Sequence, residues 1–278
     1  MYILIKLIIK LGLLKYFNII YNKNNTKIPL IGGMGYENFF GTEQWMKSVL
    51  DKLIPISTGC FIDVGTNIGQ TLIKIRNIDK EIKYIGFEPN PACIYYVDKL
   101  IDANGYQNCE VIPCGISKHN EIITLNSFYK DKADSSASII EDFRPNQTIV
   151  FKSNILAIND EMINKWQNIA AGIIKIDVEG AELYVIEGLY RMLKEYRPFI
   201  IVEILPVYSS DNLQGIERQA MLLKIMNELN YVILRIMKNE LNNFVDFKFL
   251  DSIPIHNDIS ESDYVFVPNE KYQYFKQL

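Results

Sequence analysis

Three stretches of the sequence place small residues and carboxylates directly after apolar runs of strand length. The first is DVGTNIG at 63–69, where Gly65, Asn67 and Gly69 occupy alternate positions. Glycine lets the backbone turn sharply and approach a ligand, and asparagine is the residue with a side chain that best tolerates the left-handed conformation. Asp63 ends the apolar run, where a carboxylate can anchor the loop or meet a cationic ligand. The spacing differs from the GxGxxG of dinucleotide sites, and a plain tight turn would also explain it.

The second stretch, GFEPNP at 86–91, carries a single acid, Glu88. A carboxylate after the second strand of a nucleoside-binding sheet can accept hydrogen bonds from both ribose hydroxyls. A surface acid at a strand end is the alternative. Pro89 and Pro91 stiffen the loop and favour a carboxylate that is held in place.

The third stretch, KIDVEGAE at 175–182, brings three carboxylates together at a strand end. Burying carboxylates is costly, so the cluster indicates a general base, a metal site or a helix cap. We assign Glu182 to capping or to a backbone contact, and we expect Asp177 and Glu179 to be catalytic. Glu203 ends the next apolar run and is a reserve base on the same edge. Metal dependence is not expected, because no further ligand has a defined spacing.

Alternating strands and helices position these stretches. The predicted strands are 60–64, 83–87, 109–113, 172–177, 199–204, 231–236 and 264–267, with an extra antiparallel strand at 121–128. The predicted helices are 42–53, 70–76, 91–104, 180–196 and 216–230. This alternation indicates an α/β fold with a largely parallel sheet and right-handed crossovers. Because such sheets bind ligands at the carboxyl ends of their strands, the three stretches are expected to meet in one pocket.

Composition and charge narrow the class of protein. The chain has 278 residues, 49% of them apolar, and a formal net charge of −4. Lysines and arginines form no stripe, so we do not expect a nucleic-acid partner. The four cysteines include no CxxC pair, which is typical of free thiols in a reducing compartment and favours a cytoplasmic protein.

Residues 1–22 are strongly apolar, but Lys6, Lys10 and Lys15 interrupt them, so no uncharged run approaches the ~20 residues of a spanning helix. We expect an apolar helix and a Gly/Pro-rich linker over 1–41, followed by one domain over 42–278. Packing of the helix on the domain or on a partner subunit is favoured, which leaves a homo-oligomer open. The alternative is peripheral contact with the inner membrane face.

Together, DVGTNIG, FEPNP and KIDVEGAE, the last followed by a helix and PFIIVE, resemble the FkbM family of S-adenosylmethionine-dependent methyltransferases. The resemblance runs from about residue 60 to 203, and KIDVEGAE is its most specific element. It implies the Rossmann-like class I methyltransferase fold, a doubly wound, mostly parallel seven-stranded sheet. It also implies S-adenosyl-L-methionine as methyl donor and O-methylation of a sugar, a glycan or glycolipid precursor or a related small molecule, as in polysaccharide biosynthesis.

The resemblance also implies roles for individual residues. The methionine side of the donor would be lined by Asp63, Gly65, Asn67 and Gly69. Glu88 would hold the ribose, Gly115 and Ile116 would border the adenine, and Asp177 and Glu179 would lie near the transferred methyl. Two other functions stay open: a nicotinamide-dependent oxidoreductase, against which the missing GxGxxG argues, and a non-catalytic methyltransferase-like scaffold.

Three further features carry weaker signals. The Ser-rich stretch 134–138 is either a solvated linker or a loop that supplies hydroxyls to the site. His119 and His256 are candidate bases, but we favour surface positions for both.

Overall fold

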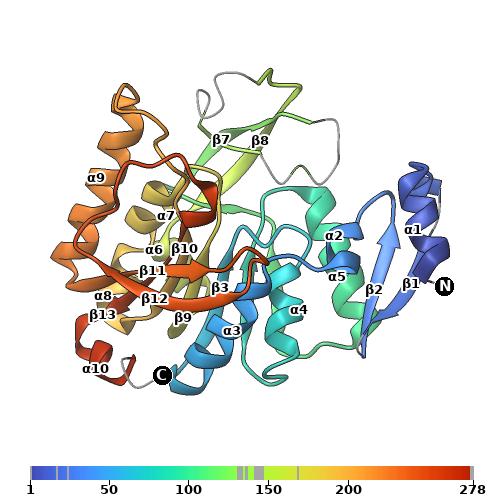
Figure 1. The fold of residues 1–278 in the computed structure, drawn as a ribbon, viewed down its shortest axis with the longest axis horizontal. Helices are drawn as coiled ribbons and strands as arrows, with labels where there is room; N and C mark the ends of the chain where they lie inside the picture. The colour runs from blue at the N-terminus through green and yellow to red at the C-terminus, as the bar shows by residue number, and fades with distance from the viewer. Residues whose placement is uncertain are drawn as a thin grey trace.

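The computed structural model describes residues 2–275 except 17, 24, 130–133, 135, 136, 141–146 and 168. Its main strands are β3 (Cys60–Val64), β4 (Tyr84–Phe87), β5 (Cys109–Ile112), β9 (Ala171–Ile176), β10 (Phe199–Glu203), β11 (Tyr231–Lys238), β12 (Phe244–Leu250) and β13 (Asp263–Pro268). They form one sheet in the order β12-β11-β13-β10-β9-β3-β4-β5 (Figure 1). β10, β9, β3, β4 and β5 run parallel, whereas β13 is antiparallel to both of its neighbours.

Helices cover both faces of this sheet. One face carries α3 (Gln44–Leu53), α4 (Gln70–Arg76) and α5 (Pro91–Asn104), and the other carries α6 (Asp160–Trp166), α7 (Glu182–Gly188), α8 (Tyr190–Tyr196) and α9 (Leu213–Glu228). Consecutive strand residues face opposite sides, so Phe61 packs in one apolar core and Ile62 in the other. The α/β, doubly wound, mostly parallel architecture is therefore confirmed.

The sheet has eight strands rather than the predicted seven. The additional strand, β12, pairs with β11 at the edge of the sheet. Asp246 and Lys248 interrupt its sequence, so it lacks the apolar run that identifies a central strand, and its residues are exposed or only partly buried. The predicted helix 180–196 is two helices, α7 and α8, which meet at Leu189. A Cβ on the preceding Gly188 would lie 2.3 Å from the Ser117 carbonyl oxygen, so the chain is closely packed at this break.

A second, smaller sheet contains the predicted extra strand. β7 (Glu121–Ser127) pairs antiparallel with β8 (Phe151–Ile158), which also pairs with the short β6 (Gly115–Ile116). Figure 1 shows β7 and β8 projecting at the top of the molecule. β8 was not predicted, because three polar residues in a row, 152–154, fill its first half and leave only a short apolar run at 155–158.

The N-terminal region differs from the predicted helix and linker. α1 spans only Tyr2–Lys10, and an antiparallel hairpin of β1 (Asn18–Lys23) and β2 (Thr26–Ile31) follows it. Gly12, with φ of 67°, follows the helix end, and Asn25, with φ of 66°, makes the hairpin turn. The rest of the predicted linker contains α2 (Tyr36–Phe40). Within the described residues, no helix has the length and apolar character needed to cross a membrane.

Candidate active site

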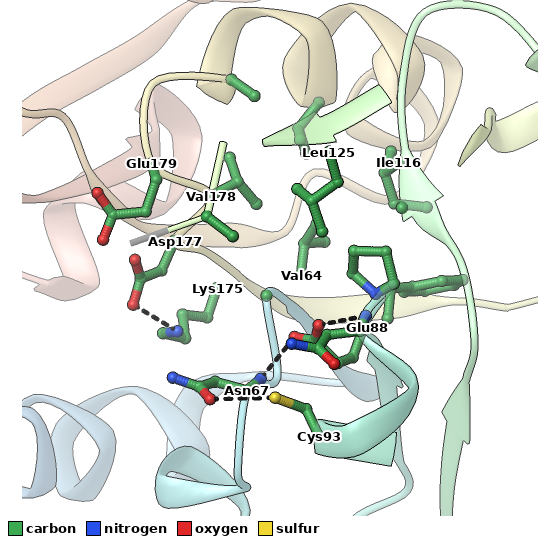
Figure 2. Close-up of a pocket in the computed structure, with 18 of the residues that line it drawn as sticks. Val64, Asn67, Glu88, Cys93, Ile116, Leu125, Lys175, Asp177, Val178 and Glu179 are labelled. Carbon is green, nitrogen blue, oxygen red and sulfur yellow. Dashed lines mark hydrogen bonds and ion pairs between the residues drawn. The ribbon is translucent and has the colours of Figure 1, made fainter. Parts of the chain in front are cut away.

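A cavity of about 330 Å³ opens at the carboxyl ends of β3, β4 and β9, with the small sheet as one wall. Eight of the predicted site residues line it: Gly65, Asn67, Glu88, Gly115, Ile116, Asp177, Glu179 and Glu203. Figure 2 shows Glu88 on one side, Lys175, Asp177 and Glu179 on the other, Val64 between them and Asn67 below. The three sequence stretches thus meet in one pocket, at the lower end of the size range of ligand sites.

The loop after β3 is fixed by three left-handed residues. Gly65, Asn67 and Gly69 have φ values of 86°, 48° and 77°. A Cβ on Gly65 would lie 1.9 Å from the carbonyl oxygen of Asp177, so this loop touches the loop after β9. Gly69 does not line the cavity. It precedes α4 as the N-cap residue, and a Cβ at this position would lie 2.9 Å from Leu100, so Gly69 packs against α5.

Two backbone amides hold the Glu88 carboxylate. The Asn67 N–H donates to Oε2 and the Asn90 N–H donates to Oε1, each at 2.8 Å. The side chain is buried, and burial raises its pKa to about 7 even though both hydrogen bonds oppose that shift. Each carboxylate oxygen has a second lone pair, so Glu88 can still accept hydrogen bonds from a ligand in the cavity.

Asp63 lies behind the cavity wall and does not line it. Its Oδ2 accepts a hydrogen bond from the Tyr84 hydroxyl at 2.6 Å, and its Oδ1 lies 3.6 Å from Lys175 Nζ. The side chain is fully buried because β3 lies between β4 and β9, with Asp63 in register with Lys175. Asp63 therefore lies outside the cavity lining, and its cationic partner within the chain is Lys175.

Lys175 connects the buried Asp63 to the acids at the cavity surface. Its Nζ lies 3.0 Å from Asp177 Oδ2. Burial disfavours the ammonium, but the carboxylates of Asp177 and Asp63 outweigh burial and raise the pKa of Lys175 above its ordinary value. The lysine therefore stays charged and fixes Asp177.

The acid cluster consists of Asp177, Glu179 and Glu203, whose carboxylate oxygens lie within 4.8 Å of one another. Burial, followed by the Asp177 charge, raises the pKa of Glu203 to about 10. Burial also opposes ionisation of Asp177, but Lys175 outweighs it and the pKa of Asp177 is lowered. At neutral pH the pair thus holds one proton on Glu203 and a negative charge on Asp177. Oxygen atoms in this arrangement are also suitable ligands for a divalent cation.

The loop that carries the acids is held from both sides. Glu179 has a left-handed backbone, with φ of 53°. Glu182 accepts a hydrogen bond from the Gly180 N–H at 2.8 Å, which confirms its predicted backbone contact. On the other side, Ser138 Oγ donates to the Glu179 carbonyl oxygen at 2.6 Å. The described part of the Ser-rich stretch therefore lies beside the site, whereas Ser135 and Ser136 lie outside the described residues.

Sequence reasoning missed several residues of the site. Lys175 is the most important of them. Its position in the sequence could have identified it: it is the only charged residue of an apolar strand, and it lies two residues before Asp177, so both side chains point to the same face. Glu37 and Glu43 also line the cavity, and Glu43 pairs with Lys74 at 3.1 Å. Neither histidine lines the cavity: His119 is exposed, and His256 Nε2 lies 3.5 Å from the Tyr264 hydroxyl.

Comparison with known proteins identifies one matching family. The sequence model of the methyltransferase FkbM domain matches residues 63–233. A comparison with curated proteins gives no match. One similar solved structure is methyltransferase FkbM from Methylobacillus flagellatus KT, at 16% identity and a TM-score of 0.45, covering 76% of this chain and 43% of that one. This chain therefore spans less than half the length of that protein.

Two further solved structures are similar over most of their own length. SMU.1697c from Streptococcus mutans, in complex with SAH, has 10% identity and a TM-score of 0.42 over 81% of this chain and 97% of that chain. Precorrin-6y C5,15-methyltransferase from Geobacter metallireducens GS-15 has 12% identity and a TM-score of 0.40 over 79% and 85%.

Proposed function

The chain belongs to the FkbM methyltransferase family, and from this premise we propose that it methylates a hydroxyl oxygen with S-adenosylmethionine as donor. The acceptor is a sugar, a glycan or glycolipid precursor or a related small molecule. The observation that carries this proposal is a single cavity that joins the loop held by Glu88 to the acids Asp177 and Glu179.

The residues present fit such a donor. Glu88 is fixed by two amides and offers two further acceptor positions, which suit the two neighbouring hydroxyls of a ribose. Gly65 and Asn67 would line the methionine side, with Gly115 and Ile116 beside the adenine. The ionised Asp177 lies at the opposite end, where a carboxylate stabilises a sulfonium charge.

Bound S-adenosylmethionine supplies an activated methyl group, so the chain chiefly has to position the reactants. As the acceptor oxygen bonds to the methyl carbon and the carbon–sulfur bond breaks, a carboxylate must take the hydroxyl proton. We assign that task to Asp177 or Glu179. Glu203 is the weaker candidate, because a pKa of about 10 leaves it protonated at neutral pH. Its proton instead orients Asp177.

The proposal is tested by incubating the protein with methyl-labelled donor and a panel of sugars, glycan precursors and glycolipid precursors. We expect label on at least one hydroxylated acceptor, and loss of transfer in Asp177→Asn or Glu179→Gln. Full activity of both variants would refute the assignment of the base. Binding of a nicotinamide cofactor in place of S-adenosylhomocysteine, measured by calorimetry, would favour the oxidoreductase. Binding of neither would favour the scaffold.

A further inference from the structure

Helix α1 has two apolar faces, and only one of them is covered. Ile5 and Ile8 are buried in a cluster with β2 residues and Phe39, so this face of α1 packs on the rest of the N-terminal segment. The opposite face remains exposed in the described structure. It consists of Ile3, Leu4 and Leu7 of α1, with 82%, 58% and 51% exposure, and of Leu11, with 59% exposure, which directly follows α1 and donates a helical hydrogen bond to the Leu7 carbonyl. At 100° per residue these four side chains fall within one arc of the helix, which defines the outer face of α1.

Charge is also distributed unevenly between the N-terminal segment and the rest of the chain. Residues 1–36 contain five lysines and no acidic residue, a net charge of +5. Because the chain as a whole has −4, residues 37–278 carry −9. Lys6 and Lys10 lie along the same edge of the outer face. Each directly precedes one of its leucines in the sequence, Leu7 or Leu11. An exposed apolar stripe bordered by lysines is therefore confined to one basic end of an acidic protein.

We propose that the outer face of α1 docks on an anionic membrane surface, with the helix axis lying in the plane of the interface. The four apolar side chains would enter the boundary between headgroups and acyl chains, while the lysine ammonium groups stay at the level of the lipid phosphates. A second copy of the chain is a poorer occupant of this face, because two segments of +5 would be brought together.

The structure fixes this docking helix to the body of the protein. Phe39 stacks on Tyr2 of α1 at 5.0 Å between ring centroids and contacts Tyr21 of β1 at 4.9 Å. The neighbouring Asn38 donates a hydrogen bond to the Ile68 carbonyl at 2.8 Å, within the loop after β3. Docking through α1 would therefore orient the whole domain. Figure 1 shows α1 and α9 at opposite ends of the molecule.

Vesicle co-sedimentation of the full chain tests the proposal. The probes are phosphatidylcholine vesicles with and without phosphatidylglycerol. We expect binding that requires phosphatidylglycerol and weakens with salt. The variant Leu4→Ser/Leu7→Ser/Leu11→Ser should bind at least about 100-fold more weakly, because three apolar side chains are removed from the lipid. Lys6→Gln/Lys10→Gln should bind about 10- to 30-fold more weakly.

Matched controls alter equally exposed residues elsewhere. Leu213→Ser/Leu241→Ser and Lys224→Gln/Lys248→Gln should sediment like the wild type, since these side chains lie outside the N-terminal segment. Unchanged melting temperatures would show that all variants fold. The proposal is overturned by an absence of vesicle binding, by equal binding of the α1 variants, or by light scattering that shows a dimer lost in the leucine variant. None of these results depends on methyl transfer.

Discussion

The two ends of the cavity hold their carboxylates in opposite ways. Glu88, at the end we assign to the donor, is fixed by the backbone amides of Asn67 and Asn90. Asp177 and Glu203, at the other end, are held by side chains: a lysine and each other. The first arrangement defines a position, whereas the second defines which group carries a proton. Donor binding and proton transfer are thus assigned to two different sets of acids. Substitutions at one end should impair binding, and substitutions at the other should impair methyl transfer.

The sharpest test of this division lies within the acid end. Asp177→Asn removes the ionised carboxylate and should lower kcat by about 10²–10⁴-fold, the range expected for a general base. Glu203→Gln is the matched control: it keeps a hydrogen-bond donor toward Asp177 and should stay within about tenfold of wild type. The measurement is labelled methyl transfer at saturating donor. Equal losses in the two variants would show that Asp177 has no special role.

A second prediction concerns the donor end. Glu88→Gln replaces a carboxylate that accepts from amides with a group that also donates, so S-adenosylhomocysteine should bind about 100-fold more weakly. Glu182→Gln is the control, because Glu182 is also a buried carboxylate bonded to a backbone amide but does not line the cavity. Calorimetry should show wild-type affinity for Glu182→Gln. Equal weakening in both variants would indicate general damage to the fold.

The same residue gives the binding a pH dependence. The pKa of Glu88 is about 7, and the protonated form cannot accept hydrogen bonds from both ribose hydroxyls. Affinity for S-adenosylhomocysteine should therefore be highest above pH 7 and fall as the pH drops below it. Titrations across this range should show the decline in wild type and a flat profile in Glu88→Gln. A flat profile in wild type would remove Glu88 from the binding site.

A smaller effect is expected on stability. Glu203 has a pKa of about 10 in the folded chain against an ordinary value of 4.5. Folding therefore takes up a proton, and the contribution of Glu203 to stability is full below pH 4.5 and is lost as the pH rises toward 10. Glu203→Gln should raise the free energy of unfolding by about 1–2 kcal/mol at pH 7. Urea denaturation at pH 5 and pH 8 should show the gain growing with pH.

The smallest expected effect is that of metal removal. Lys175 already supplies a positive charge beside Asp177, so we predict that a chelator leaves methyl transfer unchanged. Loss of activity with EDTA, restored by a divalent cation, would instead assign Asp177, Glu179 and Glu203 as metal ligands.

The central strands and helices were predictable because their signals are local. β3, α4 and α5 have the predicted bounds. A glycine or an asparagine directly follows each element: Gly65 after β3, Asn77 after α4 and Gly105 after α5. The N-terminal hairpin was missed because Asn18–Lys23 alternates in burial but not in residue type, with its apolar residues together at 19–21. α1 itself has only nine residues, about two and a half turns, before Gly12 ends the helix.

Within the site, sequence identified the residues that face the cavity better than those that support them. Asn67 and Glu88 follow strand ends, and strand ends of a parallel sheet share an edge. The place of Asp63 depended on a different fact, the pairing of β3 with β9, which sets it opposite Lys175. No spacing along the chain encodes that contact. The proton distribution between Asp177 and Glu203 likewise arises only from their burial together.

A crystal structure of the protein soaked with S-adenosylhomocysteine tests the central claim most directly. We predict both ribose hydroxyls on the Glu88 carboxylate and the sulfur atom directed toward Asp177 and Glu179. The ligand in another hollow, or its ribose against the acid cluster, would contradict the division of the cavity into a binding end and a chemical end.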